Sequence, residues 1–126
     1  MLNGDPTWQH RLLAEQDHTV LALSGEIDVN GAGQLLDLLL HATARSARVD
    51  VDLQAVEFID STVISALITA HRTALAAGRQ LAVVNPTGHV ARTLRITGVL
   101  AALSGDRENQ SSTEAPAGDK GGSPSR

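Results

Sequence analysis

Short strand-like segments alternate with helix-like segments along most of this chain. The helix-like segments repeat apolar residues at intervals of three and four, whereas the strand-like segments are short and bounded by polar or glycine-containing turns. The expected strands are residues 8–13, 20–24, 49–53 and 81–84, and the expected helices are residues 34–43, 61–77 and 89–96. This order, β-β-α-β-α-β-α, restricts the fold more than any other feature of the sequence.

Strands that are separated by helices are joined by right-handed crossovers, so the order predicts an α/β fold with a mostly parallel sheet of about four strands. Only the polar segment 15–18 separates the first two strands, which predicts a hairpin and an antiparallel N-terminal edge strand. Asp50 and Asp52 share one face of the strand 49–53. A parallel sheet is usually covered on both faces, so we expect this face to be open to solvent, or a cap or helix end to satisfy the two carboxylates.

The helix expected at residues 61–77 shows the clearest helical spacing. Its predicted apolar face consists of Ile64, Leu67, Ile68, His71 and Leu75. We interpret His71 on this face as a satisfied residue at the edge of the core. Gly78 follows as an expected C-terminal cap.

Length and composition indicate one folded domain, with expected limits at residues 5–103. The segment 104–126 contains no Val, Ile, Leu or aromatic residue, so we expect it to be a disordered tail. The net charge of −4 argues against nucleic acid as a partner. The absence of cysteine excludes disulfides and thiolate catalysis.

No segment approaches the roughly 20 apolar residues of a membrane span, and the N-terminus lacks the apolar run of a signal peptide. We therefore expect a cytoplasmic protein without membrane insertion. Arg supplies nine of the ten basic residues, which is typical of a GC-rich bacterial genome.

Polar residues gather at two junctions where an expected strand leads into a helix. The first junction is GEIDVN (25–30) and the second is FIDST (58–62). Both follow parallel strands, so both should open on the same edge of the sheet, with Asp28 and Asp60 as neighbours and Ser61 between them and solvent. Taken alone, Asp28, Asp60 or Ser61 could equally be an ordinary helix N-cap.

The residues favour no enzyme, metal site or cofactor. The five histidines lack the i, i+4 and Glu-x-x-His spacings of metal ligands. A hydrolytic Ser61 would require a Gly-x-Ser-x-Gly turn, and Asp60 and Thr62 do not provide one.

Several motifs in order resemble the STAS domain of bacterial anti-sigma factor antagonists. They are LSGEID (23–28), VDLQAVEFIDST (51–62), Gly78, LAVVNP (81–86) and LRITG (94–98). The resemblance extends over about residues 8–103 and implies a STAS-like fold and a protein-binding domain without catalytic activity.

The resemblance also implies how such a domain is controlled. Ser61 corresponds to a serine that is phosphorylated by the anti-sigma factor, which is also a serine kinase. A phosphatase removes that phosphate. The unphosphorylated form binds the anti-sigma factor and thereby frees the sigma factor to regulate transcription. Asp60 corresponds to the acid of the motif and Asp28 to the acid of the other junction. The predicted partner-binding residues are Asp28, Asn30, Asp60, Ser61, Thr62, Val63 and Ser65.

This sequence departs from the family pattern after Ser61. The family commonly continues its Asp-Ser-Ser with Gly-Leu-Gly, whereas here Thr62 replaces the second serine, and Val63 and Ser65 replace the two glycines. We expect the Val63 side chain to fill space that glycine leaves for the partner. Thr62 is a second possible phosphoacceptor. An alternative function stays open: a STAS scaffold or transporter-associated subunit in which Ser61 is only a helix cap. A homodimer is also possible.

Overall fold

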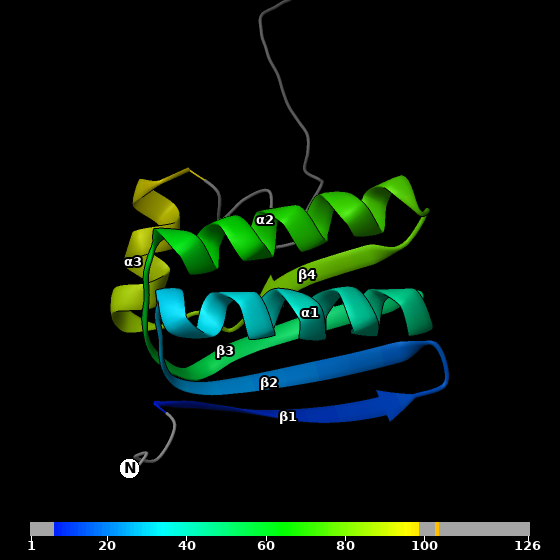
Figure 1. Cartoon of the computed structure of the whole chain (residues 1–126), viewed down its shortest axis with the longest axis horizontal. Helices are drawn as coiled ribbons and strands as arrows, with labels where there is room; N and C mark the ends of the chain where they lie inside the picture. The colour runs from blue at the N-terminus through cyan, green and yellow to red at the C-terminus, as the bar shows by residue number, and fades with distance from the viewer. Residues whose placement is uncertain (1–6, 99–102, 104–126) are drawn as a thin grey trace, which may run out of the picture.

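The computed structural model describes residues 7–98 and Leu103, and these form the expected α/β fold (Figure 1). The strands are β1 (Trp8–Glu15), β2 (His18–Ile27), β3 (Arg48–Ile59) and β4 (Gln80–Val84), and the helices are α1 (Val29–Arg45), α2 (Ser61–Ala76) and α3 (Gly88–Ile96). The predicted order of elements is confirmed. Several elements are longer than predicted, above all α1 and β3.

The four strands form one mixed sheet in the order β1-β2-β3-β4. β1 pairs antiparallel with β2, and β2, β3 and β4 run parallel, as predicted. The hairpin turn between β1 and β2 contains Gln16, whose φ of 50° lies in the left-handed region that tight turns require.

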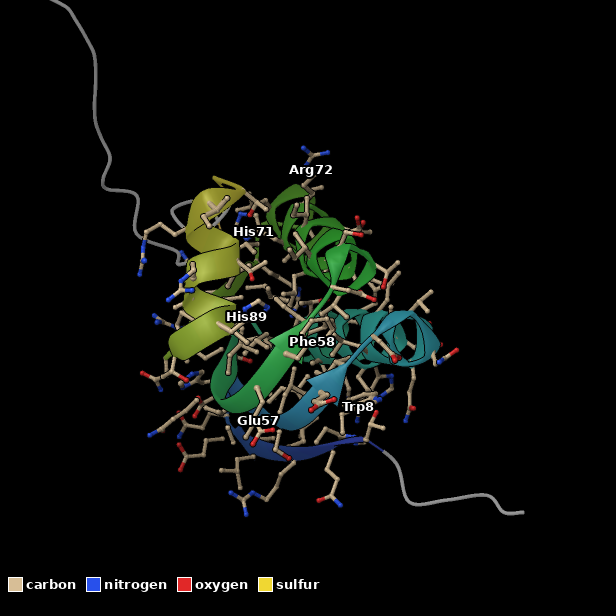
Figure 2. The ribbon with its side chains drawn as sticks, turned by 90° about the vertical axis from the view of Figure 1, so that its left-hand side faces the viewer. Trp8, Glu57, Phe58, His71, Arg72 and His89 are labelled. Carbon is tan, nitrogen blue, oxygen red and sulfur yellow. The ribbon has the colours of Figure 1, made fainter. Side chains whose placement is uncertain are left out.

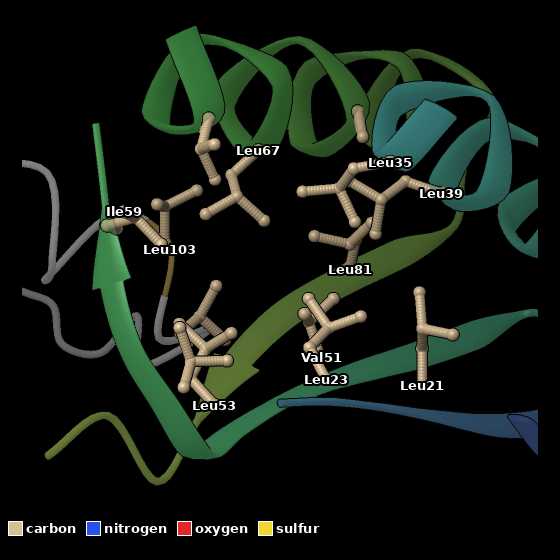
Figure 3. Close-up of a cluster of buried hydrophobic side chains, with 14 of the residues drawn as sticks. Leu21, Leu23, Leu35, Leu39, Val51, Leu53, Ile59, Leu67, Leu81 and Leu103 are labelled. Atoms are coloured by element: carbon tan, nitrogen blue, oxygen red, sulfur yellow. The ribbon is translucent and has the colours of Figure 1, made fainter. Parts of the chain in front are cut away.

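One face of the sheet is covered by α1 and α2, which lie side by side above it (Figures 1 and 2). Alternate residues of the central strands point into this layer, because successive side chains of a strand face opposite sides. The buried cluster includes Leu21 and Leu23 of β2, Val51 and Leu53 of β3, and Leu35 and Leu39 of α1 (Figure 3). This packing fixes the ends of β2 and β3 relative to the helices that follow them.

The buried face of α2 differs in part from the predicted one. Ile64 and Leu67 are buried as expected, but Leu75 is 57% exposed, so its place in the core was predicted wrongly. The core face runs instead along small residues, including Ala66, Ala70 and Ala74. His71 Nδ1 donates a hydrogen bond to the carbonyl oxygen of Leu81 at 2.8 Å, because a carbonyl oxygen can only accept. This confirms His71 as a satisfied residue at the core edge.

Asp50 and Asp52 lie on the face of the sheet opposite α1 and α2, where both carboxylates have hydrogen-bond partners. Asp50 is bound by His18 Nε2 at 2.8 Å and by Arg48 Nε at 3.4 Å. Asp52 accepts from the Gln54 amide at 2.9 Å and from Asn85 Nδ2 at 3.4 Å. Both aspartates are half-buried on the face opposite α1 and α2, so that face is accessible to solvent here.

The predicted tail, residues 104–126, lies outside the described residues, as does most of the segment that follows α3. Within the described ranges, no helix is long and apolar enough to cross a membrane.

Candidate functional site at the strand-to-helix junctions

Two strand-to-helix junctions lie next to each other at the carboxyl end of the parallel strands. β2 ends at Ile27 and is followed by Asp28, and β3 ends at Ile59 and is followed by Asp60. Ile27 and Ile59 are partners in the β2–β3 register. The prediction that both junctions open on the same edge of the sheet is therefore confirmed.

Asp60 is the N-cap of α2. Its carboxylate accepts hydrogen bonds from the backbone amides of Thr62 at 3.0 Å and Val63 at 3.2 Å, and from the hydroxyl of Thr62. The Thr62 hydroxyl is the main cause that lowers the pKa of Asp60 below its ordinary value of 3.8, and the amides of Val63, Thr62 and Val29 lower it further against an opposing effect of burial. Because Val29 begins α1, Asp60 connects the two junctions.

Asp28 is the corresponding N-cap of α1. Its side chain accepts from the Asn30 amide at 3.0 Å, and it is half-buried, whereas Asn30 is exposed. A cap of this kind typically contributes about 1 kcal/mol to helix stability. The capping role of Asp28 is thus established in the fold, and its part in partner recognition stays a prediction.

Ser61 is the first residue of α2, and its side chain is exposed. Its hydroxyl makes no hydrogen bond to any described residue. The N-cap of α2 is Asp60, so the expectation that Ser61 could cap this helix is wrong. The scaffold or transporter-associated function with which that expectation was combined does not depend on the cap and stays a prediction. The outward hydroxyl of Ser61 is accessible to another protein.

The neighbouring hydroxyl residues differ from Ser61. Thr62 is half-buried, and its hydroxyl donates to Asp60. Ser65 is exposed one helical turn after Ser61, on the same side of α2. Of the two adjacent hydroxyls at the start of α2, only that of Ser61 is therefore both exposed and uncommitted within the described part of the chain.

Val63 does not belong to the surface. It is 1% exposed and packs in the hydrophobic core, because its position in the first turn of α2 faces the sheet. We expected the Val63 side chain to fill space that a partner would need, and this expectation is wrong. Val63 is a core residue that anchors the first turn of α2 to the sheet.

Two apolar side chains near the junctions were not predicted as site residues. Phe58 is 39% exposed and stacks on His89 of α3, with ring centroids 5.6 Å apart and planes 6° from parallel (Figure 2). Val29, directly after Asp28, is 62% exposed. Strand alternation could have identified Phe58, because it precedes the buried Ile59 and must point away from the core. Its contact with α3 depends on tertiary packing that the sequence does not reveal.

We call this region the junction surface, and it combines carboxylates, hydroxyls and exposed apolar groups. Its members are Asp28, Val29, Asn30, Phe58, Asp60, Ser61 and Ser65. Exposed apolar side chains with polar groups around them are typical of protein-binding surfaces. Among the described residues, no group of three or more His, Asp or Glu side chains is placed to hold a metal ion.

The start of α1 is fixed by the single tryptophan of the chain. Gly31 lies against the indole of Trp8, and a Cβ at Gly31 would be 2.4 Å from the indole Nε1. A side chain larger than hydrogen therefore does not fit at this position without displacing Trp8. This contact holds the first turn of α1, and with it Asp28, against β1.

Comparison with solved structures identifies several similar folds. An anti-sigma factor antagonist from Mycobacterium paratuberculosis superposes with a TM-score of 0.70 and 23% identity, over 81% of this chain and 87% of that chain. The phosphorylated form of the Bacillus cell fate determinant SpoIIAA gives a TM-score of 0.62 and 15% identity, over 86% and 91% of the two chains. The murine anion transporter Slc26a9 gives 0.59 and 16% identity, over 69% of this chain but only 15% of that chain.

A search of curated protein sequences gave no match. The sequence does match the family model described as "Mlab, STAS domain" over residues 10–103. This match covers the sheet from β1 onward, all three helices and both junctions. The chain therefore belongs to the STAS domain family.

Proposed function

We propose that this chain is an anti-sigma factor antagonist that acts in the cytoplasm as a non-catalytic binding module. Its unphosphorylated form binds an anti-sigma factor through the junction surface and so releases a sigma factor. The anti-sigma factor, acting as a serine kinase, phosphorylates Ser61, and a phosphatase reverses the modification.

The observation that carries this proposal is the state of the Ser61 hydroxyl. It is exposed, it lies at the first position of α2, and no described residue engages it. A kinase must bring its active site to the acceptor oxygen. The exposed hydroxyl of Ser61, at the first residue of α2, permits that approach. Thr62 is a poorer acceptor, because its half-buried hydroxyl already binds Asp60.

The position also explains how a phosphate could act without unfolding the domain. A phosphoserine adds about −1.5 to −2 charges at neutral pH. The N-terminal amides of α2 and the helix dipole favour negative charge at this place, so the fold should tolerate the modification.

The same charge would oppose partner binding. Asp28 and Asp60 already lie at this edge, and Glu57 is exposed near the end of β3. A partner that packs on the junction surface would have to desolvate the phosphate beside these carboxylates. A difference of about 3 kcal/mol in binding free energy is enough for a roughly hundredfold loss of affinity.

The exposed apolar side chains of the junction surface offer apolar area that such a partner would bury on binding. The ring of Phe58 is positioned by its stack on His89, and Val29 presents a branched apolar side chain at the other junction. Preordered apolar side chains of this kind contribute strongly to protein interfaces.

Incubation with ATP and the cognate anti-sigma factor, followed by intact mass measurement, tests the acceptor assignment. We expect one phosphate on the wild-type chain and on Ser65→Ala, and none on Ser61→Ala. Equal phosphate uptake by wild type and Ser61→Ala would exclude Ser61 as the acceptor.

A constitutive scaffold or transporter-associated subunit is the second candidate. A similar fold within the much longer Slc26a9 chain favours it, as do the residues after Ser61, which differ from the Gly-Leu-Gly pattern. In that case Ser61→Asp would bind the partner as tightly as wild type, and the chain would elute in a large complex.

A further inference from the structure

The outer edge of β1 is a second candidate interaction surface. β1 is the edge strand of the sheet, and all its residues from Gln9 to Glu15 are exposed (Figure 1). Leu12 is 44% exposed and Leu13 is 56% exposed. The strand contains neither Lys nor Pro, two residue types that commonly protect an edge strand from pairing, and its charged residues are Arg11 and Glu15.

The hairpin register identifies which backbone groups of β1 point outward. The Glu26 amide donates to the Thr7 carbonyl at 2.9 Å, so the backbone groups of Thr7 face β2. Backbone groups alternate along an antiparallel strand, and odd-numbered residues of β1 therefore face β2. The outward N–H and C=O groups belong to Trp8, His10, Leu12 and Ala14, and no described segment pairs with them.

We propose that this edge pairs antiparallel with β1 of a second copy of the chain, about a two-fold axis at Leu13. This register places Leu12 opposite Ala14 and uses the outward backbone groups of both strands. The two four-stranded sheets become one continuous sheet. A two-fold axis at a paired edge is the simplest closed symmetry for two copies.

Charge complementarity selects this register. With Leu13 on the axis, Arg11 of each copy faces Glu15 of the other, which forms two cross-strand ion pairs on one face of the sheet. With Arg11 on the axis, two arginines would face each other. With Leu12 on the axis, Arg11 would face Leu13, and no opposite charges would be paired.

The proposal does not depend on phosphorylation of Ser61, because the edge of β1 and the junction surface involve different residues. Failure of one proposal would therefore leave the other standing.

Single cysteine substitutions test the register directly, because the chain contains no cysteine of its own. In the proposed dimer, Leu13 and its symmetry mate form a non-hydrogen-bonded pair with Cα atoms about 4.5 Å apart, within disulfide range. The two Leu12 residues are offset along the strands by two positions, which separates their Cα atoms by about 8 Å and prevents a disulfide. The full chain carrying Leu13→Cys should form a disulfide dimer under mild oxidation, and the matched variant Leu12→Cys should stay monomeric.

Weak cross-linking of Leu13→Cys, or equal or stronger cross-linking of Leu12→Cys, would overturn the proposal. Both side chains are exposed, so both variants should fold, which far-UV circular dichroism checks.

Charge reversal provides an independent readout of dimerisation by sedimentation equilibrium. Arg11→Glu or Glu15→Arg alone should weaken the dimer about tenfold, because each places like charges opposite one another twice. The double variant exchanges the two charges and should restore dimerisation. A monomeric wild type, or a double variant no better than the single variants, would contradict the pairing.

Discussion

The hydroxyl of Thr62 donates a hydrogen bond to the carboxylate of Asp60, the residue that caps the helix on which Thr62 lies. This bond commits one of two adjacent hydroxyl groups to the fold and leaves the other, on Ser61, exposed. The local structure thereby separates a supporting residue from a candidate modification site.

Removing the Thr62 hydroxyl should lower the stability of the fold but should not prevent phosphorylation of the chain. Thr62→Val keeps the shape of the side chain but deletes the bond to Asp60, and we expect a loss of about 1 kcal/mol in the free energy of unfolding. Thr69→Val, at an exposed position of the same helix, should change stability little. Urea unfolding measures both. Phosphate uptake by Thr62→Val should persist, and its loss would point to Thr62 as the acceptor.

The hydrogen bonds to Asp60 should also make stability depend on pH in the acid range. The folded pKa of Asp60 is lowered, chiefly by the Thr62 hydroxyl, so its carboxylate stabilises the fold fully above the unfolded value near 3.8. That contribution is lost as the pH falls through the lower folded value.

Urea midpoints measured from about pH 6 down to pH 2 check this linkage. Wild type should exceed Asp60→Asn in stability at the upper end, and the difference should shrink toward the lower end. Glu57→Gln, which alters an exposed carboxylate nearby, is the control. A difference between wild type and Asp60→Asn that stays constant across the range would contradict the role assigned to the ionised carboxylate.

The contact between Trp8 and Gly31 predicts opposite effects at two glycines of α1. Gly31→Ala places a methyl group 2.4 Å from the indole nitrogen, so it should displace Trp8, shift its fluorescence and destabilise the protein by about 1–3 kcal/mol. Gly33→Ala meets no atom within 4 Å and should stabilise the helix by about 0.5–1 kcal/mol. Equal effects of the two substitutions would mean that Trp8 does not pack on Gly31.

Phe58 should contribute strongly to the affinity for the partner, although its side chain is only partly exposed. Phe58→Ala removes the stacked ring at the junction surface and should weaken binding of the anti-sigma factor by tenfold or more. Leu75→Ala, which also removes an exposed apolar side chain but near the far end of α2, should leave affinity unchanged. Titration calorimetry distinguishes the two. Equal losses would place the interface elsewhere.

The arrangement of the junctions could be predicted from the sequence because it follows from strand direction alone. Once 20–24 and 49–53 are recognised as parallel neighbours, Asp28 and Asp60 must follow them at the same edge. The open sheet face was among the expected solutions for Asp50 and Asp52, since two carboxylates on one strand face require solvent or partners.

Other features depend on tertiary contacts that periodicity does not encode. Leu75 has the spacing of a core residue, yet the buried face of α2 includes Ala66, Ala70 and Ala74 instead. Val63 occupies a position where the family commonly has glycine, and only the structure reveals that its side chain faces inward. The Phe58–His89 stack joins two elements whose relative placement could not be derived from their sequences.

In the proposed function a phosphate on Ser61 controls partner binding, so the phosphorylated and unmodified chains should differ in their affinity for the anti-sigma factor. Titration calorimetry with the unmodified chain and with the chain phosphorylated at Ser61 should give at least hundredfold weaker binding for the phosphorylated form. Thr69→Asp, which adds a negative charge at an exposed position of α2 outside the junction surface, is the control and should leave the affinity unchanged. Equal affinity of the phosphorylated and unmodified chains would exclude control of binding by Ser61 phosphorylation.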